Sequence, residues 1–137
     1  MKKSILTSLI VMCIATTASA TAIEIKHLEA PKEFLRTKNK VWQEKLDTDI
    51  SFNNKNSKLE FIFKSVEFIT EVKIDRTKIK PTSDRYTITS SMTFRDFLWS
   101  LCNELKLQAE WKTNEKKGEL PCIELKAKKA SPKKPNH

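Results

Sequence analysis

The side chains with the most reactive chemistry in this sequence are few and widely spaced. The cysteines near the C-terminal half are Cys102 and Cys122, and the histidines, His27 and His137, lie near opposite ends of the chain. Zinc sites and nucleophilic triads need histidines, thiolates and carboxylates at characteristic spacings, and no such spacing occurs here. The only glycine, Gly118, excludes a glycine-rich phosphate loop. The sequence therefore predicts no catalytic residue, no metal site and no cofactor, which favours a protein that is not an enzyme.

The two cysteines leave two alternatives open. In an oxidising compartment, a bridge between Cys102 and Cys122 would close a loop of about 20 residues and add about 3 kcal/mol of stability. If Ile123 and Leu125 point into a core, however, strand alternation turns Cys122 outward, away from the buried side of a helix. The sequence does not decide between a disulfide and two separate thiols. A Cys–His dyad using His27 is a remote third alternative, because an isolated histidine seldom has a catalytic role.

The first twenty residues have the pattern of a cleaved export signal. Lys2 and Lys3 are followed by an apolar run over residues 5–15 and by the small residues 18–20. The run is too short to span a bilayer. We therefore expect an exported protein, periplasmic in the first instance and extracellular as the alternative.

The next level of organisation is a strand and helix unit that occurs twice. The elements expected are strand 50–52, helix 57–69 and strand 71–74, then strand 85–89, helix 93–105 and strand 106–111, and a last strand 123–125. Asn56 or Ser57 is expected to cap the first helix, and Thr93 with Asp96 the second. The order β-α-β-β-α-β-β predicts an α+β fold, a small mixed sheet with two helices on one face.

Helical spacing separates inward from outward side chains. The inward residues are expected to be Leu59, Ile62, Phe63, Val66 and Ile69 in the first helix, and Phe94, Phe97, Leu98, Leu101 and Leu105 in the second. Phe61 and Phe68 lie on the opposite side, one above the other, and Trp99 is also off the inward stripe. We expect a helical segment from Pro31, within residues 31–46, to cover Phe61 and Phe68. The alternative is that these residues contact a partner, as we expect of Trp99.

Charge is concentrated at the C-terminal end. The chain carries a net charge of +9, and residues 126–137 include five lysines and no acidic residue. The chain is thus expected to comprise a signal (1–20), a partly helical extension (21–46), the α+β domain (47–125) and a disordered basic tail (126–137). Carboxylates such as Glu67 and Glu71 are interpreted as solvated helix charges.

Residues 45–125 resemble the short N-terminal domains of secretins and TonB-dependent receptors. The resemblance lies in DISFNNKNSKLEFIFKSVEFITEVKID (49–75) and YTITSSMTFRDFLWSLCNELKLQAEW (86–111). Glu71 and Lys106 stand where the family usually has glycines, so those chain reversals are expected to differ locally, and no channel or barrel sequence follows. The resemblance implies a periplasmic module that binds other proteins.

Two functions from different classes follow. The first is a non-enzymatic protein-binding module of the cell envelope, docking through a sheet edge or an exposed aromatic onto secretion, pilus or uptake machinery. The alternative is a cationic protein that binds an anionic surface or polymer, such as membrane, nucleic acid or exopolymer, through its lysine-rich tail. Nucleic acid is the less expected partner, peripheral membrane contact stays open, and the oligomeric state is not predicted.

Overall fold

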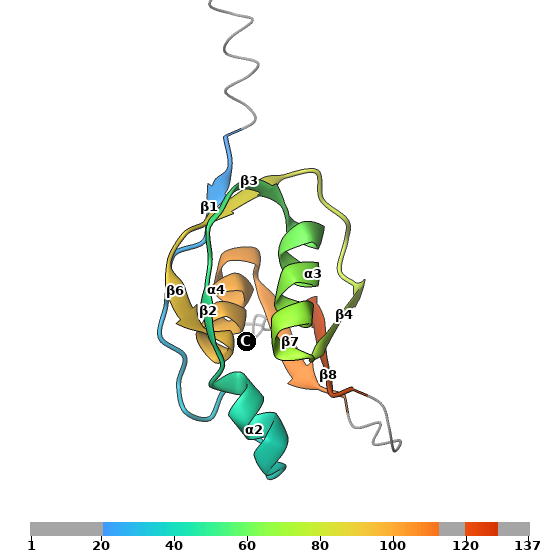
Figure 1. The fold of residues 1–137 in the computed structure, drawn as a ribbon. Helices are drawn as coiled ribbons and strands as arrows, with labels where there is room; N and C mark the ends of the chain where they lie inside the picture. The colour runs from blue at the N-terminus through green and yellow to red at the C-terminus, as the bar shows by residue number, and fades with distance from the viewer. Residues whose placement is uncertain (1–20, 113–119, 129–137) are drawn as a thin grey trace, which may run out of the picture.

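The computed structural model describes residues 21–112 and 120–128, which form an α+β fold (Figure 1). The predicted signal and most of the predicted tail lie outside these residues. The helices are α2 (Lys40–Leu46), α3 (Leu59–Thr70) and α4 (Phe94–Leu105). The strands are β1 (Ile23–Glu24), β2 (Asp49–Ser51), β3 (Asn54–Lys58), β4 (Lys73–Lys78), β5 (Arg85–Ile88), β6 (Ser91–Thr93), β7 (Leu107–Trp111) and β8 (Cys122–Ala127).

The strands form three small sheets, so the single mixed sheet expected from the sequence is wrong. Antiparallel pairs β2–β6 and β3–β5 follow one another along a bent ribbon, with β1 parallel to β5 on its outer side. The third sheet has the order β4-β8-β7, with β8 parallel to β4 and antiparallel to β7. The strands are divided between the ribbon and the third sheet because of the way the two longer helices connect them. Helix α3 carries the chain from β3 to β4 and α4 carries it from β6 to β7, so each helix leads from the ribbon to the third sheet.

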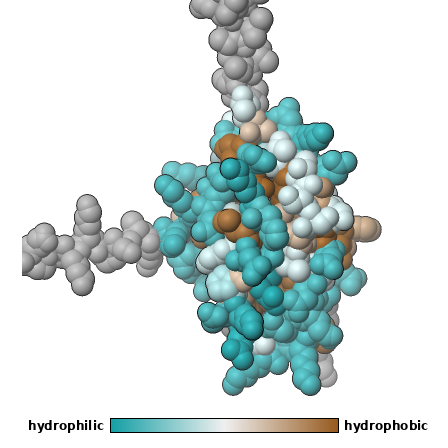
Figure 2. Space-filling model, turned by 90° about the vertical axis from the view of Figure 1, so that its left-hand side faces the viewer, coloured by the Kyte–Doolittle hydropathy of each residue, from teal (hydrophilic) through white to brown (hydrophobic). Residues whose placement is uncertain are grey.

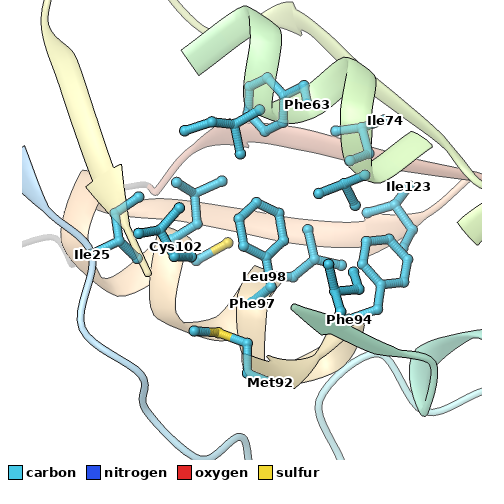
Figure 3. Packing of buried hydrophobic residues seen from close by; sticks show 14 of the residues in the cluster. Ile25, Phe63, Ile74, Met92, Phe94, Phe97, Leu98, Cys102 and Ile123 are labelled. Atoms are coloured by element: carbon cyan, nitrogen blue, oxygen red, sulfur yellow. The ribbon is translucent and has the colours of Figure 1, made fainter. Parts of the chain in front are cut away.

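A single hydrophobic core lies between these layers. The inward residues of α3 and α4 pack with residues of β4 and β8, including Ile74, Ile123 and Leu125 (Figure 3). The predicted inward faces are confirmed with one exception. Ile69 is exposed, and Thr70 is buried in its place. Thr70 follows Leu59 by eleven residues, which is close to three full helical turns, so both side chains lie on the same side of α3. Ile69 follows Leu59 by ten residues, so its side chain is rotated away from that side by most of the angle between successive residues.

The helix starts agree with the sequence in one unit and not in the other. The Thr93 side chain accepts a hydrogen bond from the Asp96 N–H at 3.1 Å, so the predicted cap of α4 is confirmed. The predicted cap of α3 is wrong, because Lys58 precedes the helix and makes no side-chain capping bond. Strand β3 continues to Lys58, and Asn56 adopts a left-handed conformation (φ 52°) at a bulge.

Helices α3 and α4 end in the same way. The expectation that these chain reversals would differ locally, because they lack the glycines of the family, is therefore wrong. Glu71 follows α3 with φ 59° and ψ 32°, and Lys106 follows α4 with φ 56° and ψ 54°. Each donates its backbone N–H to a carbonyl four residues earlier, Glu67 and Cys102 respectively. Two non-glycine residues thus occupy the left-handed region that glycine adopts without strain.

Lys106→Gly is accordingly expected to raise the free energy of unfolding by about 0.5–1 kcal/mol. The substitution removes the clash between Cβ and the backbone in the left-handed region, and this gain exceeds the added entropy of the unfolded chain. Urea denaturation measures it. Lys106→Ala is the matched control, since it removes the same side chain but keeps Cβ. Equal stability of the two variants would contradict the argument.

Candidate functional site

The outward side of α3 carries exposed aromatic side chains. Phe61 is 58% exposed, Phe68 is 86% exposed, and Ile69 beside Phe68 is also exposed. Their exposure follows from the burial of Leu59, Phe63 and the other inward residues, which fixes the rotation of the helix about its axis. Phe61 and Phe68 are seven residues apart and therefore lie on one side, two turns from each other. This outward surface of α3 is a candidate docking face.

The prediction that residues 31–46 cover this face is wrong. Helix α2 begins at Lys40 rather than at Pro31, and it is capped by Asn39, whose side chain accepts from the Trp42 N–H at 3.1 Å. The aromatic side chains of this segment pack elsewhere. Phe34 contacts Trp99 edge to face at 5.0 Å between ring centroids. Trp42 stacks on a second tryptophan of the domain, Trp111, at 4.9 Å.

Trp99 is thus only partly covered by the chain itself, and the partner contact expected there stays a prediction. Burial of Leu35 and Leu46 anchors the N-terminal segment at two points of the core. In addition, the Trp111 indole N–H donates to the Leu35 carbonyl at 2.6 Å. These pairings could not be predicted from the sequence, since aromatic contacts between distant segments depend on the tertiary path of the chain.

Two polar side chains of α4, Asp96 and Ser100, form hydrogen bonds with residues 27–30 of the N-terminal segment. One carboxylate oxygen of Asp96 accepts the Ala30 N–H at 2.9 Å, and the other lies 2.9 Å from His27 Nε2. One turn further on, the Ser100 hydroxyl accepts the Leu28 N–H at 2.8 Å. His27 therefore contacts a carboxylate rather than a cysteine, and the remote Cys–His dyad is not formed.

Both cysteines that the structure describes, Cys102 and Cys122, are free thiols. Cys102 is buried on α4, and burial raises the pKa of its thiol to about 12. Cys122 is half-buried at the start of β8, and burial raises its pKa as well. Because Ile123 and Leu125 point into the core, alternation along β8 places Cys122 on the other side of the sheet. Of the two alternatives, the structure has the separate thiols.

In native protein at about pH 8, Cys102 is therefore expected to resist alkylation by iodoacetamide, since almost none of its thiol is ionised. Peptide mapping after labelling, with and without urea, measures this, and Cys122 provides the internal comparison. An intact mass that rises by two hydrogens on reduction, with both sites protected from alkylation until then, would contradict the separate thiols.

The outer side of the β4-β8-β7 sheet carries a row of carboxylates that the sequence analysis missed. Cross-strand pairing places Asp75 and Glu110 on either side of Glu124. Lysines intervene: Lys112 lies 2.5 Å from Asp75 and 4.0 Å from Glu124, while Lys78 lies 3.2 Å from Glu124. Hydrogen bonds from Lys112 and from Thr77 lower the pKa of Asp75. Only strand register, which the sequence does not supply, could have revealed this row.

Several kinds of site are absent from the part of the chain that the structure describes. Within residues 21–112 and 120–128, no cluster of three or more histidine, cysteine, aspartate and glutamate side chains could hold a metal ion. In the same residues, no helix has both the length and the apolar character needed to cross a bilayer. The chain matches no protein-family model, no curated protein and no solved structure.

Proposed function

We propose that this chain is an exported, non-enzymatic protein-binding module of the cell envelope, and that a partner protein docks on the outward surface of α3. The exposed pair Phe61 and Phe68 supports the proposal most directly. Each exposed phenylalanine leaves a large apolar area in water, which a partner would remove. Phenylalanine is also among the side chains enriched at protein interfaces.

The other described elements each carry fewer exposed large apolar residues. On the side formed by β1 and β6, apolar groups occur as small separate areas within a mainly hydrophilic surface (Figure 2). Among the remaining exposed large apolar residues, Leu28 lies in the N-terminal segment, Val41 on α2 and Leu120 just before β8. The outward surface of α3 is where three such residues share one helix.

The location in the envelope is supported by sequence alone. The charged and apolar segments and the small residues of positions 1–20 have the order of a cleavable export signal. The resemblance of residues 45–125 to short secretin and TonB-receptor domains suggests partners in secretion, pilus or uptake machinery.

The test is saturable binding of the labelled full chain to an envelope fraction. Phe68→Asp and Phe61→Asp are expected to reduce the affinity at least tenfold, equivalent to about 1.4 kcal/mol. Val41→Asp is the matched control, because Val41 is as exposed as Phe61, at 58%, but lies on α2. Absence of saturable binding, or equal loss in all three variants, would overturn the proposal.

The basic tail on which the cationic alternative depends is shorter than the sequence predicted. The predicted tail from Lys126 begins too early, because β8 extends to Ala127 and the Lys126 ammonium lies 2.8 Å from Glu110. Removal of residues 129–137 would abolish binding to anionic vesicles if the tail is responsible, and that binding would weaken steeply with salt.

A further inference from the structure

We propose that β7 is a second, independent binding site, where an extended peptide carrying a carboxylate adds as a strand to the free edge of the β4-β8-β7 sheet. The peptide would place an apolar side chain in the groove between β7 and α4. This site does not involve the outward surface of α3, so it stands or falls separately from the docking face proposed above.

The ladder between β7 and β8 shows which backbone groups of β7 are directed outward. Beyond the two ends of the ladder, the Lys112 N–H donates to the Cys122 carbonyl at 2.8 Å and the Lys128 N–H donates to the Lys106 carbonyl at 3.0 Å. Antiparallel pairs alternate between hydrogen-bonded and non-bonded residues, so the even-numbered residues of β7 bond to β8. The backbone N–H and carbonyl groups directed away from β8 are those of Leu107, Ala109 and Trp111.

These outward groups offer a template for a strand. No backbone hydrogen bond from another described segment reaches them. The opposite edge of the sheet is protected in the usual ways: β4 has a register shift between Asp75 and Lys78 and carries lysines at both ends. Strand β7 pairs with β8 without a shift and contains no lysine or proline. Within residues 21–112 and 120–128, the sheet therefore has one blocked edge and one open edge.

A groove beside the open edge would receive a side chain of the added strand. Its volume is about 270 Å³, and it lies between β7 and α4, with Phe34 and Trp99 at one wall and Leu107 and Ala109 at the other. The edge-to-face contact of the two aromatic rings gives that wall a defined shape. A groove of this size and lining fits an apolar side chain of the peptide better than a charged one.

The lysines that line the groove favour a peptide of negative charge. Lys106 and Lys128 line the groove, and no acidic residue is among the described residues that line it. The positive charge of Lys128 also acts on the Cys102 thiol inside the groove, where it opposes the effect of burial on the thiol pKa. A peptide with an aspartate, a glutamate or a terminal carboxylate would pair with these lysines. The lysine-rich residues 129–137 of the chain would be repelled, so they are a poor occupant.

The test is selection of a displayed library of random dodecapeptides on the folded full chain, with selected peptides then measured by titration. Enriched peptides are expected to contain an acidic residue and alternating apolar residues. Ala109→Pro, which removes an outward N–H, should weaken them at least tenfold. Lys128→Gln should weaken them about threefold. Phe68→Asp should have no effect, nor should Lys80→Gln, which changes an exposed lysine between β4 and β5 that is not among the groove residues.

One further measurement tests the proposal without a change in the protein. An added strand directs every second backbone N–H toward β7, so methylation of one alternate set of peptide nitrogens should abolish binding and methylation of the other set should not. This result does not depend on whether Ala109→Pro folds. Peptides that bind equally well with either set methylated, or a library that yields no binder, would overturn the proposal. Binding lost only in Phe68→Asp would overturn this site and support the docking face of α3.

Discussion

Phe97→Ala is expected to lower the free energy of unfolding by about 3–5 kcal/mol. Phe97 lies on the inward side of α4 with no exposed surface, and its ring stacks on Phe52 at 5.0 Å and 25° between planes. The substitution removes the contact between α4 and the segment that joins β2 to β3, and it leaves a cavity that the surrounding core fills only in part. Urea denaturation followed by circular dichroism measures the loss.

Phe61→Ala is the matched control for this prediction. It makes the same chemical change on the equivalent helix of the other unit, but Phe61 is 58% exposed. Its expected effect on stability is close to zero, because little burial is lost and alanine favours the helix slightly. Comparable losses in the two variants would mean that Phe61 is covered in solution, which would remove the basis for the docking face on α3.

The contrast between these two phenylalanines shows what the sequence could predict. Positions 61 and 97 differ in their phase relative to the apolar stripe, and a period of 3.6 residues is enough to assign one outward and the other inward. The cap at Thr93 was predictable for a similar reason, since it depends on residues only three positions apart. Local chemistry was therefore enough to predict the inward sides of α3 and α4, the cap of α4 and the α+β class.

What the sequence could not supply is the pairing of distant segments. Phe34 and Trp99 are far apart in sequence, and nothing in either segment shows that they meet. Strand β3 was not expected, because residues 54–58 are polar and show no alternation, and residues 57–58 were assigned to the helix that follows. The pairing of β3 depends on β5, whose residue Tyr86 is buried opposite Ser57. The open edge of β7 was hidden for the same reason, since an edge is defined by which strands do not pair.

Arg76→Ala is expected to lower the free energy of unfolding by about 2 kcal/mol. The Arg76 guanidinium joins α3 to β4 through several contacts: it pairs with Glu60, donates to Glu67 at 3.0 Å and to the Ile74 carbonyl at 2.8 Å, and lies 5.0 Å from the centre of the Phe63 ring. Glu67, interpreted from the sequence as a solvated charge, also accepts the Ile74 N–H at 2.7 Å. It is therefore a structural group that positions the start of β4.

Two variants calibrate the Arg76 prediction. Arg76→Lys keeps the charge but loses the planar, forked donor geometry, so an intermediate loss is expected. Arg85→Ala removes an exposed arginine whose guanidinium makes a single 3.3 Å hydrogen bond to the Asn56 carbonyl, and its effect should stay within about 0.5 kcal/mol. A loss in Arg85→Ala as large as that in Arg76→Ala would show that the network around Arg76 has no special weight.

The pH dependence separates the ionic part of this network from its packing. The hydrogen bond from Arg76 lowers the pKa of the Glu60 carboxyl below its ordinary value of 4.5. A carboxyl whose pKa is lower in the folded state contributes stability above its unfolded pKa, and that stability is lost as the pH falls through the folded pKa. The difference between wild type and Arg76→Ala should therefore be largest near neutral pH and shrink below about pH 4. A difference that stays constant into acid would assign the role of Arg76 to its contact with Phe63 and its hydrogen bond to the Ile74 carbonyl.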